Sequence, residues 1–274
     1  AVVHGVILRL GLITVGCVLL ITVYLVISGI PAIQKIGLVP FLTGKVWSST
    51  SAEPKSGILP FILTSVSGPA GAIVLGVPIG LVAPNMLRSV REAAVSLLAG
   101  SQSVVYGLVG MMVLVPAIRK TFHLPDGASL FAAIIVLAVM ILPSIIKVSV
   151  TALEAVPHEY EDASLALGAT EVETYFRVSV PAAKRGIAAA VVLGVGRAIG
   201  EALAVMMVSG TAPNMPGASF ESGRFLTTAV ASEMAYSSGL QRQALFSIAL
   251  VLYLFILLIN AALNFFLKRD KEGN

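Results

Sequence analysis

Arg197 and Glu201 stand four residues apart inside an apolar run, 187–210, that reads Gly194-Val195-Gly196-Arg197-Ala198-Ile199-Gly200-Glu201 at its centre. On a continuous helix this spacing puts both side chains on one face, one turn apart. An arginine near the centre of a bilayer costs about 2.5–3.5 kcal/mol on insertion scales, and such charges usually line pathways. The planar guanidinium fork suits a tetrahedral oxyanion. We predict that Arg197 binds an anion and that Glu201 orients Arg197. A structural pair whose charges only neutralise each other is the alternative.

A second pattern lies in the polar segment 151–186, where Asp162-Ala163-Ser164 is followed by Gly168 and then by Val178-x-Val180-Pro181. Pro157 suits the first turn of a helix, and the acidic residues after it favour the positive end of that helix. Gly168 can adopt the left-handed conformation that ends one helix before another begins. Two short helices meeting at this glycine would form a knob that fits a groove on another protein. The residues assigned to this docking loop are Glu161, Asp162, Ala163, Ser164, Gly168 and Pro181. An ordinary amphipathic connector is the alternative.

The elements that must position these residues are membrane-spanning helices. Hydrophobic residues make up 57% of the 274-residue chain and charged residues only 12%, against about 25% charged in soluble domains. A bilayer needs about 20 apolar residues per helix. Six runs qualify, at about 6–29, 58–82, 93–118, 129–150, 187–210 and 244–267, and we predict one all-α transmembrane domain over 1–274. The first run is too long for a signal peptide and lacks a small-residue cleavage site.

The distribution of basic residues predicts the orientation of these six spans. An even number of spans places both termini on one side, together with 83–92 and the docking loop. That side carries ten Lys and Arg residues: Arg9, Arg88, Arg91, Lys147, Arg177, Lys184, Arg185, Lys268, Arg269 and Lys271. The other side carries seven: Lys35, Lys45, Lys55, Arg119, Lys120, Arg224 and Arg242. Positively charged segments favour the cytoplasm, so we expect cytoplasmic termini and a cytoplasmic docking loop.

Several chemistries have no matching residues. The sequence has no G-x-x-x-x-G-K-[ST] loop for ATP phosphates, and no nucleophile elbow or pair of intramembrane acids for catalysis. Its single cysteine, Cys17, lies inside the first span, and its three histidines fall in polar segments without metal-ligand spacing. We expect a chain that is no enzyme, binds no metal or nucleic acid and takes its energy from another subunit.

The pattern in 151–186 resembles the EAA loop of ABC-transporter permeases, with Asp162 for Glu, Ser164 for the second Ala, and Val for Ile and Leu. The residues from Gly196 to Glu201 resemble the G-R-A-x-G-E-T signature of phosphate ABC permeases. Over nearly its full length, the chain is similar to the C-type permease subunit of phosphate-specific transport (Pst) systems. Supporting stretches are Gly57-Ile58-Leu59-Pro60-Phe61, Ser103-Val104-Val105-Tyr106-Gly107 and Ala166-Leu167-Gly168-Ala169-Thr170. The chain departs from the family at Ser101-Gln102, Ser96, Ala202 and a second span that is shorter between Pro78 and Pro84.

The resemblance implies a type I ABC importer permease in the bacterial inner (plasma) membrane, with Arg197 and Glu201 as its phosphate-binding residues. The implied partners are a homologous A-type permease, a dimer of ATP-binding subunits and a periplasmic or lipid-anchored phosphate-binding protein. ATP and Mg would be bound by the ATPase, and no cofactor by this chain. A permease for another oxyanion, such as molybdate or sulfate, is an alternative. A stand-alone channel or secondary carrier is another.

Overall fold

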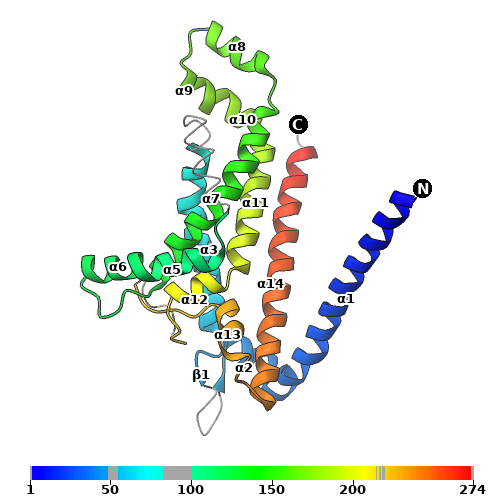
Figure 1. The fold of residues 1–274 in the computed structure, drawn as a ribbon, viewed down its shortest axis with the longest axis vertical. Coiled ribbons are helices and arrows are strands. Elements are labelled where there is room, and N and C mark those ends of the chain that lie inside the picture. The colour runs from blue at the N-terminus through cyan, green and yellow to red at the C-terminus, as the bar shows by residue number, and fades with distance from the viewer. Residues whose placement is uncertain are drawn as a thin grey trace.

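The computed structural model describes residues 2–48, 55–82, 100–213, 215, 217 and 220–272, and the account below is confined to them. Long helices run side by side along the vertical axis of Figure 1. Within the described residues, five helical segments are long and apolar enough to cross a membrane: Arg9–Ile36, Leu59–Val82, Ser103–Phe122, Leu130–Glu154 and Gly239–Ala262. The helices Glu171–Ala182 and Lys184–Gly200, which meet at an angle of 77°, would make a sixth crossing only if they count together as one span. Five of the six predicted spans coincide with such a helix over most of their described length, and the sixth, predicted at 187–210, has a counterpart only if the bent pair counts as one span.

The centre of the bundle is α7 (Leu130–Glu154), against which α3 (Leu59–Val82) and α11 (Lys184–Gly200) pack. Glycines allow this close approach. A Cβ on Gly76 of α3 would lie 2.9 Å from Ile141 Cδ1, and one on Gly80 would lie 2.8 Å from Ile145 Cγ2. A Cβ on Gly194 of α11 would lie 3.1 Å from the same Ile145. The interior of the bundle is therefore formed by isoleucines of α7 set against backbone on both sides.

The path from 103 to 121 crosses the bundle instead of following it. It comprises α5 (Ser103–Val109), the π-helix η2 (Gly110–Leu114) and α6 (Val115–Thr121). In Figure 1, α5 and α6 lie across the direction of α7. The Val115 amide donates to the Gly110 carbonyl, five residues back, and Pro116 follows it. A proline has no N–H to donate and disturbs the usual register, so the wider turn precedes it. Residues 93–99 of the predicted third span, and the segment 83–92, lie outside the described residues.

The end of the bundle shown at the bottom of Figure 1 holds α2 (Leu38–Thr43), the antiparallel strands β1 (Trp47–Ser48) and β2 (Lys55–Ser56), and α13 (Leu226–Glu233). Its apolar cluster includes Phe41, Trp47 and Phe61. Beside it, the carboxylate of Glu233 forms an ion pair with Arg224 and accepts a hydrogen bond from Trp47 Nε1 at 3.3 Å. These contacts fix the segment before α13 to the strand pair.

The first and last helices, α1 (Val2–Ile36) and α14 (Gly239–Glu272), pack on each other. The Ser247 hydroxyl donates to the Gly29 carbonyl at 2.5 Å, and Thr22 and Tyr253 hydroxyls lie 3.0 Å apart. From there α1 diverges from the bundle, and both N and C lie in the upper part of Figure 1, towards the end that carries α8 (His158–Ala166). The predicted placement of both ends and the docking loop on one side is confirmed.

Candidate functional site

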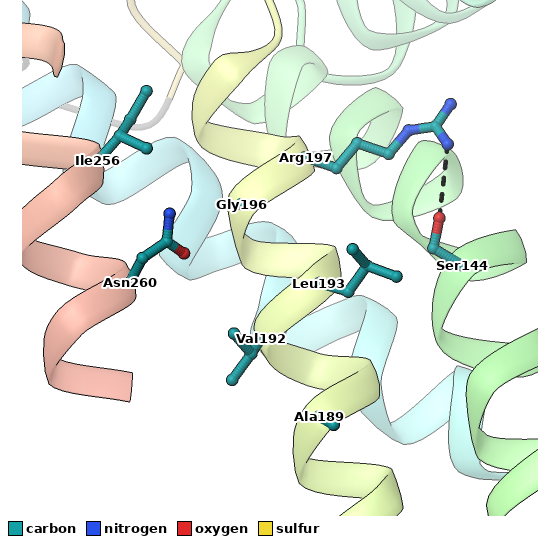
Figure 2. A pocket seen from close by; sticks show the side chains of 8 residues that line it. All are labelled: Ser144, Ala189, Val192, Leu193, Gly196, Arg197, Ile256 and Asn260. Atoms are coloured by element: carbon teal, nitrogen blue, oxygen red, sulfur yellow. Dashed lines mark hydrogen bonds between the residues drawn. The ribbon is translucent and has the colours of Figure 1, made fainter. Parts of the chain in front are cut away.

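Arg197 lies in the last turn of α11 and faces a cavity of about 650 Å³. Its Nη1 donates to the Ser144 hydroxyl of α7 at 3.4 Å, a long hydrogen bond that leaves most of the guanidinium donors uncommitted. Figure 2 shows the side chain reaching from α11 towards Ser144, while Asn260 enters from α14 on the other side of α11. The cavity is lined by Ser144, Ala189, Val192, Leu193, Gly196, Arg197, Ile256 and Asn260. The predicted anion-binding residue therefore faces an open space whose lining is mainly apolar, with Ser144 and Asn260 as the other polar side chains.

Glu201 is placed differently from the prediction. The expected continuous helix over 187–210 is wrong, because α11 ends at Gly200 and α12 begins at Leu203 and runs to Val208. Glu201 between them is extended, with φ −73° and ψ 129°, so it does not lie on the helix face of Arg197. Within the described part of the chain, no ion pair joins these two residues. The predicted orienting contact is therefore absent from this conformation.

Glu201 instead connects three segments. Its Oε2 accepts a hydrogen bond from the Ser103 hydroxyl of α5 at 3.0 Å, and its Oε1 accepts one from the Ala204 amide at 3.1 Å. Its backbone carbonyl accepts from the Thr227 hydroxyl of α13 at 2.8 Å. A carboxylate at the first turn of α12 satisfies a free N–H and complements the helix dipole. The break in the span is thus held by the Glu201 side chain itself.

The sequence analysis missed the residues around this pair. Ser144 and Asn260 share the cavity with Arg197, and Tyr106 lies within electrostatic reach of Arg197 while hydrogen-bonded to Ser101. Ser101 is one of the positions at which the chain departs from the family pattern. A signal for Ser144 and Asn260 was present, since each is a polar residue inside an apolar span. Nothing in the sequence indicated which of the spans would face Arg197.

The backbone of the predicted docking loop follows its prediction of short helices that meet at Gly168. Helix α8 begins with Glu159 and Glu161 in its first turn, and Gly168 follows it with a φ of +89°. The chain then forms α9 (Glu171–Thr174), the π-helix η3 (Tyr175–Ser179) and α10 (Val180–Ala182), which contains Pro181. Pro157 lies just before α8, at its N-cap, and not inside its first turn. The left-handed turn at Gly168 is confirmed.

Side-chain hydrogen bonds make this loop one unit. The Ser179 hydroxyl donates to Glu161 Oε1 at 2.7 Å, and the Ser164 and Thr174 hydroxyls lie 2.9 Å apart. Thr170 and Glu173 form a capping box at the start of α9. The backbone amide and hydroxyl of Thr170 hydrogen-bond to the carboxylate and lower the pKa of Glu173. Two of the predicted docking residues, Glu161 and Ser164, therefore stabilise the loop from within.

The outer surface of the loop carries exposed apolar side chains. Leu167 is 90% exposed and Tyr160 is 57% exposed, while Asp162, Ala163 and Gly168 are exposed beside them. Val172 and Phe176 extend the same kind of surface along α9 and η3. Exposed apolar groups rimmed by polar ones mark protein interaction sites. This surface can accept another protein.

The docking loop and the Arg197 cavity are connected through α11. The 77° bend at Ala183 joins α10 to α11, and Arg197 lies thirteen residues beyond Lys184, a rise of about 20 Å along a helix. The Tyr175 hydroxyl also donates to the Leu81 carbonyl at the end of α3, at 2.7 Å.

Within the described residues, no group of three or more His, Cys, Asp or Glu side chains could hold a metal ion.

Comparisons with known proteins agree with this arrangement. Residues 72–270 match the family described as the binding-protein-dependent transport system inner membrane component. The chain is 38% identical over 265 residues to the probable ABC transporter permease protein YqgH of Bacillus subtilis, covering 91% of this chain and 86% of that protein. It is 30% identical to the phosphate transport system permease protein PstC of Haemophilus influenzae, over 85% of this chain and 82% of the relative.

Two solved structures show the same fold. The inward-facing MetNI methionine ABC transporter matches with a TM-score of 0.58 at 18% identity, covering 78% of this chain and 94% of the matched chain. An amino acid ABC transporter with histidines matches with a TM-score of 0.55 at 17% identity, covering 77% and 92%. At these identities the likeness concerns the fold alone.

Proposed function

Because the chain belongs to the inner-membrane components of binding-protein-dependent transport systems, we propose that it forms half of the translocation pathway of an ATP-driven phosphate importer. As an ABC permease it is a membrane subunit and works with an ATPase and a substrate-binding protein. The partners proposed in detail are a homologous A-type permease, a dimer of ATP-binding subunits that hold ATP and Mg, and a periplasmic or lipid-anchored phosphate-binding protein.

The observation that carries the proposal is the position of Arg197. It is a permanently charged side chain in a membrane-crossing helix, and it is exposed to a cavity. Its hydrogen bond to the Ser144 hydroxyl is long, at 3.4 Å. An arginine in the membrane without a carboxylate partner is costly, and an incoming anion removes that cost. In this proposal Arg197 binds the oxyanion at the cavity wall. Glu201 is a positioning residue, which holds the end of α11 relative to α5 and α13.

Phosphate is the oxyanion that the relatives favour. Several relatives are phosphate transport system permeases, including one from Pasteurella multocida that is 29% identical over 85% of this chain. The guanidinium alone would accept sulfate or molybdate equally well. The substrate therefore has to be decided by transport and not by the charge of the site.

The proposed experiment reconstitutes the complete importer in liposomes, with its binding protein outside and ATP inside. We expect phosphate, and not sulfate or molybdate, to raise ATP hydrolysis and to accumulate inside. Arg197→Gln should reduce phosphate uptake more than tenfold, and Arg197→Lys should reduce it less, because lysine keeps the charge but loses the fork. The matched control is Arg9→Gln, an arginine in α1 that lies outside the cavity. Full uptake by Arg197→Gln would refute the site, and stimulation by sulfate or molybdate alone would refute the substrate.

A further inference from the structure

Lys147 is a second basic side chain inside a helix that qualifies as a membrane crossing. It lies in α7, seven residues before the last residue, Glu154, which corresponds to about 10 Å along a helix. The Lys147 side chain is exposed, and within the described residues no carboxylate forms an ion pair with it. Charged residues inside membrane helices usually face a water-filled path or pair with another charge. The position of Lys147 therefore points to an aqueous or anionic neighbour.

Lys147 shares one face of α7 with Ser144 and Thr151. Residues three and four apart on a helix are neighbours, with Cβ atoms about 5–6 Å apart. Ser144 accepts the hydrogen bond from Arg197 at 3.4 Å. One turn further on, the exposed Thr151 donates its hydroxyl proton to the Lys147 carbonyl at 3.1 Å. The polar face of α7 thus begins beside Arg197 and continues towards the docking loop.

The direction of α7 turns the Lys147 side chain back towards Ser144. In Figure 1, α7 runs towards the docking loop and α11 runs away from it. Side chains on a helix lean towards its N-terminus, so we expect Lys147 to lean away from the docking loop. Figure 2 shows the Arg197 guanidinium above the Ser144 hydroxyl, towards the end of α11. The two cationic residues therefore lie on one path, with Ser144 between them.

The Arg197 cavity extends in the same direction as this path. Its lining follows α11 from Arg197 back to Ala189, eight residues or about 12 Å towards the docking loop. The remaining α11 residues of the lining are apolar or glycine, so they offer an anion no charge. Apart from Arg197 and the pair Lys184-Arg185 at the start of α11, Lys147 is the only basic residue of α7 and α11. It lies between these two positions along the bundle.

We infer that Lys147 is the second cationic contact of the transported oxyanion, which reaches it after leaving Arg197 and before entering the cytoplasm. This inference rests on the proposed function and adds an exit step to a site otherwise defined by one charge. Passage through a membrane requires binding that is weak enough, or spread over enough positions, for the ion to leave. The ammonium of lysine is a point charge without the arginine fork. Lys147 would therefore attract the ion without holding it as specifically as Arg197 does.

The test measures phosphate uptake and ATP hydrolysis in the reconstituted importer, with saturating phosphate-loaded binding protein. For Lys147→Gln we expect uptake to fall about tenfold, the effect of losing one hydrogen bond to a charged group. ATP hydrolysis should stay within about twofold of the wild type, because the docking loop is unchanged. Lys147→Arg keeps the charge and should retain roughly half of the uptake or more. The matched control is Lys184→Gln, an exposed lysine at the start of α11, which should stay within about twofold.

Three results would overturn the inference. Uptake by Lys147→Gln within about twofold of the wild type is what a lysine that only extends to the lipid headgroups predicts. An equal loss of uptake in Lys184→Gln would show a general effect of charge at this end of the bundle. Loss of the ATPase or of the second permease from the purified Lys147→Gln assembly would show that Lys147 supports packing and not the passage of the ion.

Arg197→Gln, measured in parallel, separates these results from the proposed function. If Arg197→Gln abolishes uptake and Lys147→Gln does not, only the role of Lys147 fails. If Arg197→Gln transports normally, the proposed anion site is refuted. The same variants are measured with sulfate and with molybdate, so that the role of Lys147 is decided even if phosphate is not the substrate.

Discussion

Replacing Glu201 by glutamine and by alanine separates a role in holding the helix break from a role that needs the negative charge. In the structure the carboxylate accepts two hydrogen bonds, from Ser103 and from the Ala204 amide. Glutamine can keep both, because its carbonyl can accept from the amide and its NH₂ can donate to the Ser103 hydroxyl. Alanine removes both and leaves the Ala204 N–H, in the first turn of α12, without this partner.

The magnitudes follow from these contacts. A hydrogen bond to a charged group contributes about 1.5–3 kcal/mol when buried, and Glu201 is only half-buried. We therefore expect Glu201→Ala to destabilise the chain by roughly 2–3 kcal/mol and Glu201→Gln by about 1 kcal/mol or less. For a chain of this size, each kcal/mol lowers the midpoint of thermal unfolding by roughly 2–4 °C. The expected shifts are about 4–12 °C for alanine and below about 4 °C for glutamine.

The assay combines thermal unfolding of the detergent-solubilised importer with phosphate uptake after reconstitution. We expect Glu201→Gln to keep most of the uptake and Glu201→Ala to lose both stability and uptake. The double variant with Ser103→Ala should be less destabilised than the sum of the two single variants, because both remove the same hydrogen bond. Loss of uptake in Glu201→Gln without a thermal shift would refute the reasoning, and would show that transport uses the charge of Glu201.

Three further predictions concern the docking loop and the topology. Gly168→Pro should prevent co-purification of the ATPase, because proline cannot adopt a φ of +89°. Gly168→Ala, at a cost of about 1–2 kcal/mol, should only weaken binding of the ATPase. Normal co-purification with the proline variant would contradict the loop assignment. Tyr175→Phe removes the hydrogen bond to α3 and should lower phosphate uptake per ATP while the ATPase stays bound; an unchanged ratio would exclude that contact from coupling. Leu167 is 90% exposed and Tyr236 is 92% exposed. After removal of Cys17, Leu167→Cys should react with an impermeant thiol reagent only from the cytoplasm, and Tyr236→Cys should react only from outside. The reverse pattern would invert the topology.

The sequence was sufficient for features that depend on composition or on local backbone chemistry. The spans follow from runs of about 20 apolar residues, and the turn at Gly168 follows from the left-handed conformation that glycine adopts easily. The break at Glu201 could not be predicted in this way, because a continuous and a broken span have the same hydropathy. Its cause is tertiary, since Ser103 and Thr227, which bind Glu201, are 98 and 26 residues away in sequence.

The geometry of α11 explains how a docking loop at one end could control an anion site inside the membrane. Gly186 and Gly194 bring α11 close against Ala152 and Ile145 of α7, so we expect α11 to move as one rigid element and not to bend. Its end at Gly200 is separated from α12 by Glu201 and Ala202, which are not helical, and Glu201 joins the two helices through its hydrogen bond from the Ala204 amide. A tilt of roughly 10° about the bend at Ala183 would therefore displace a point about 20 Å along α11 by about 3–4 Å. Arg197 lies at that point, one turn before the break, so a small movement of the docking loop would move its guanidinium further than any residue earlier on the helix.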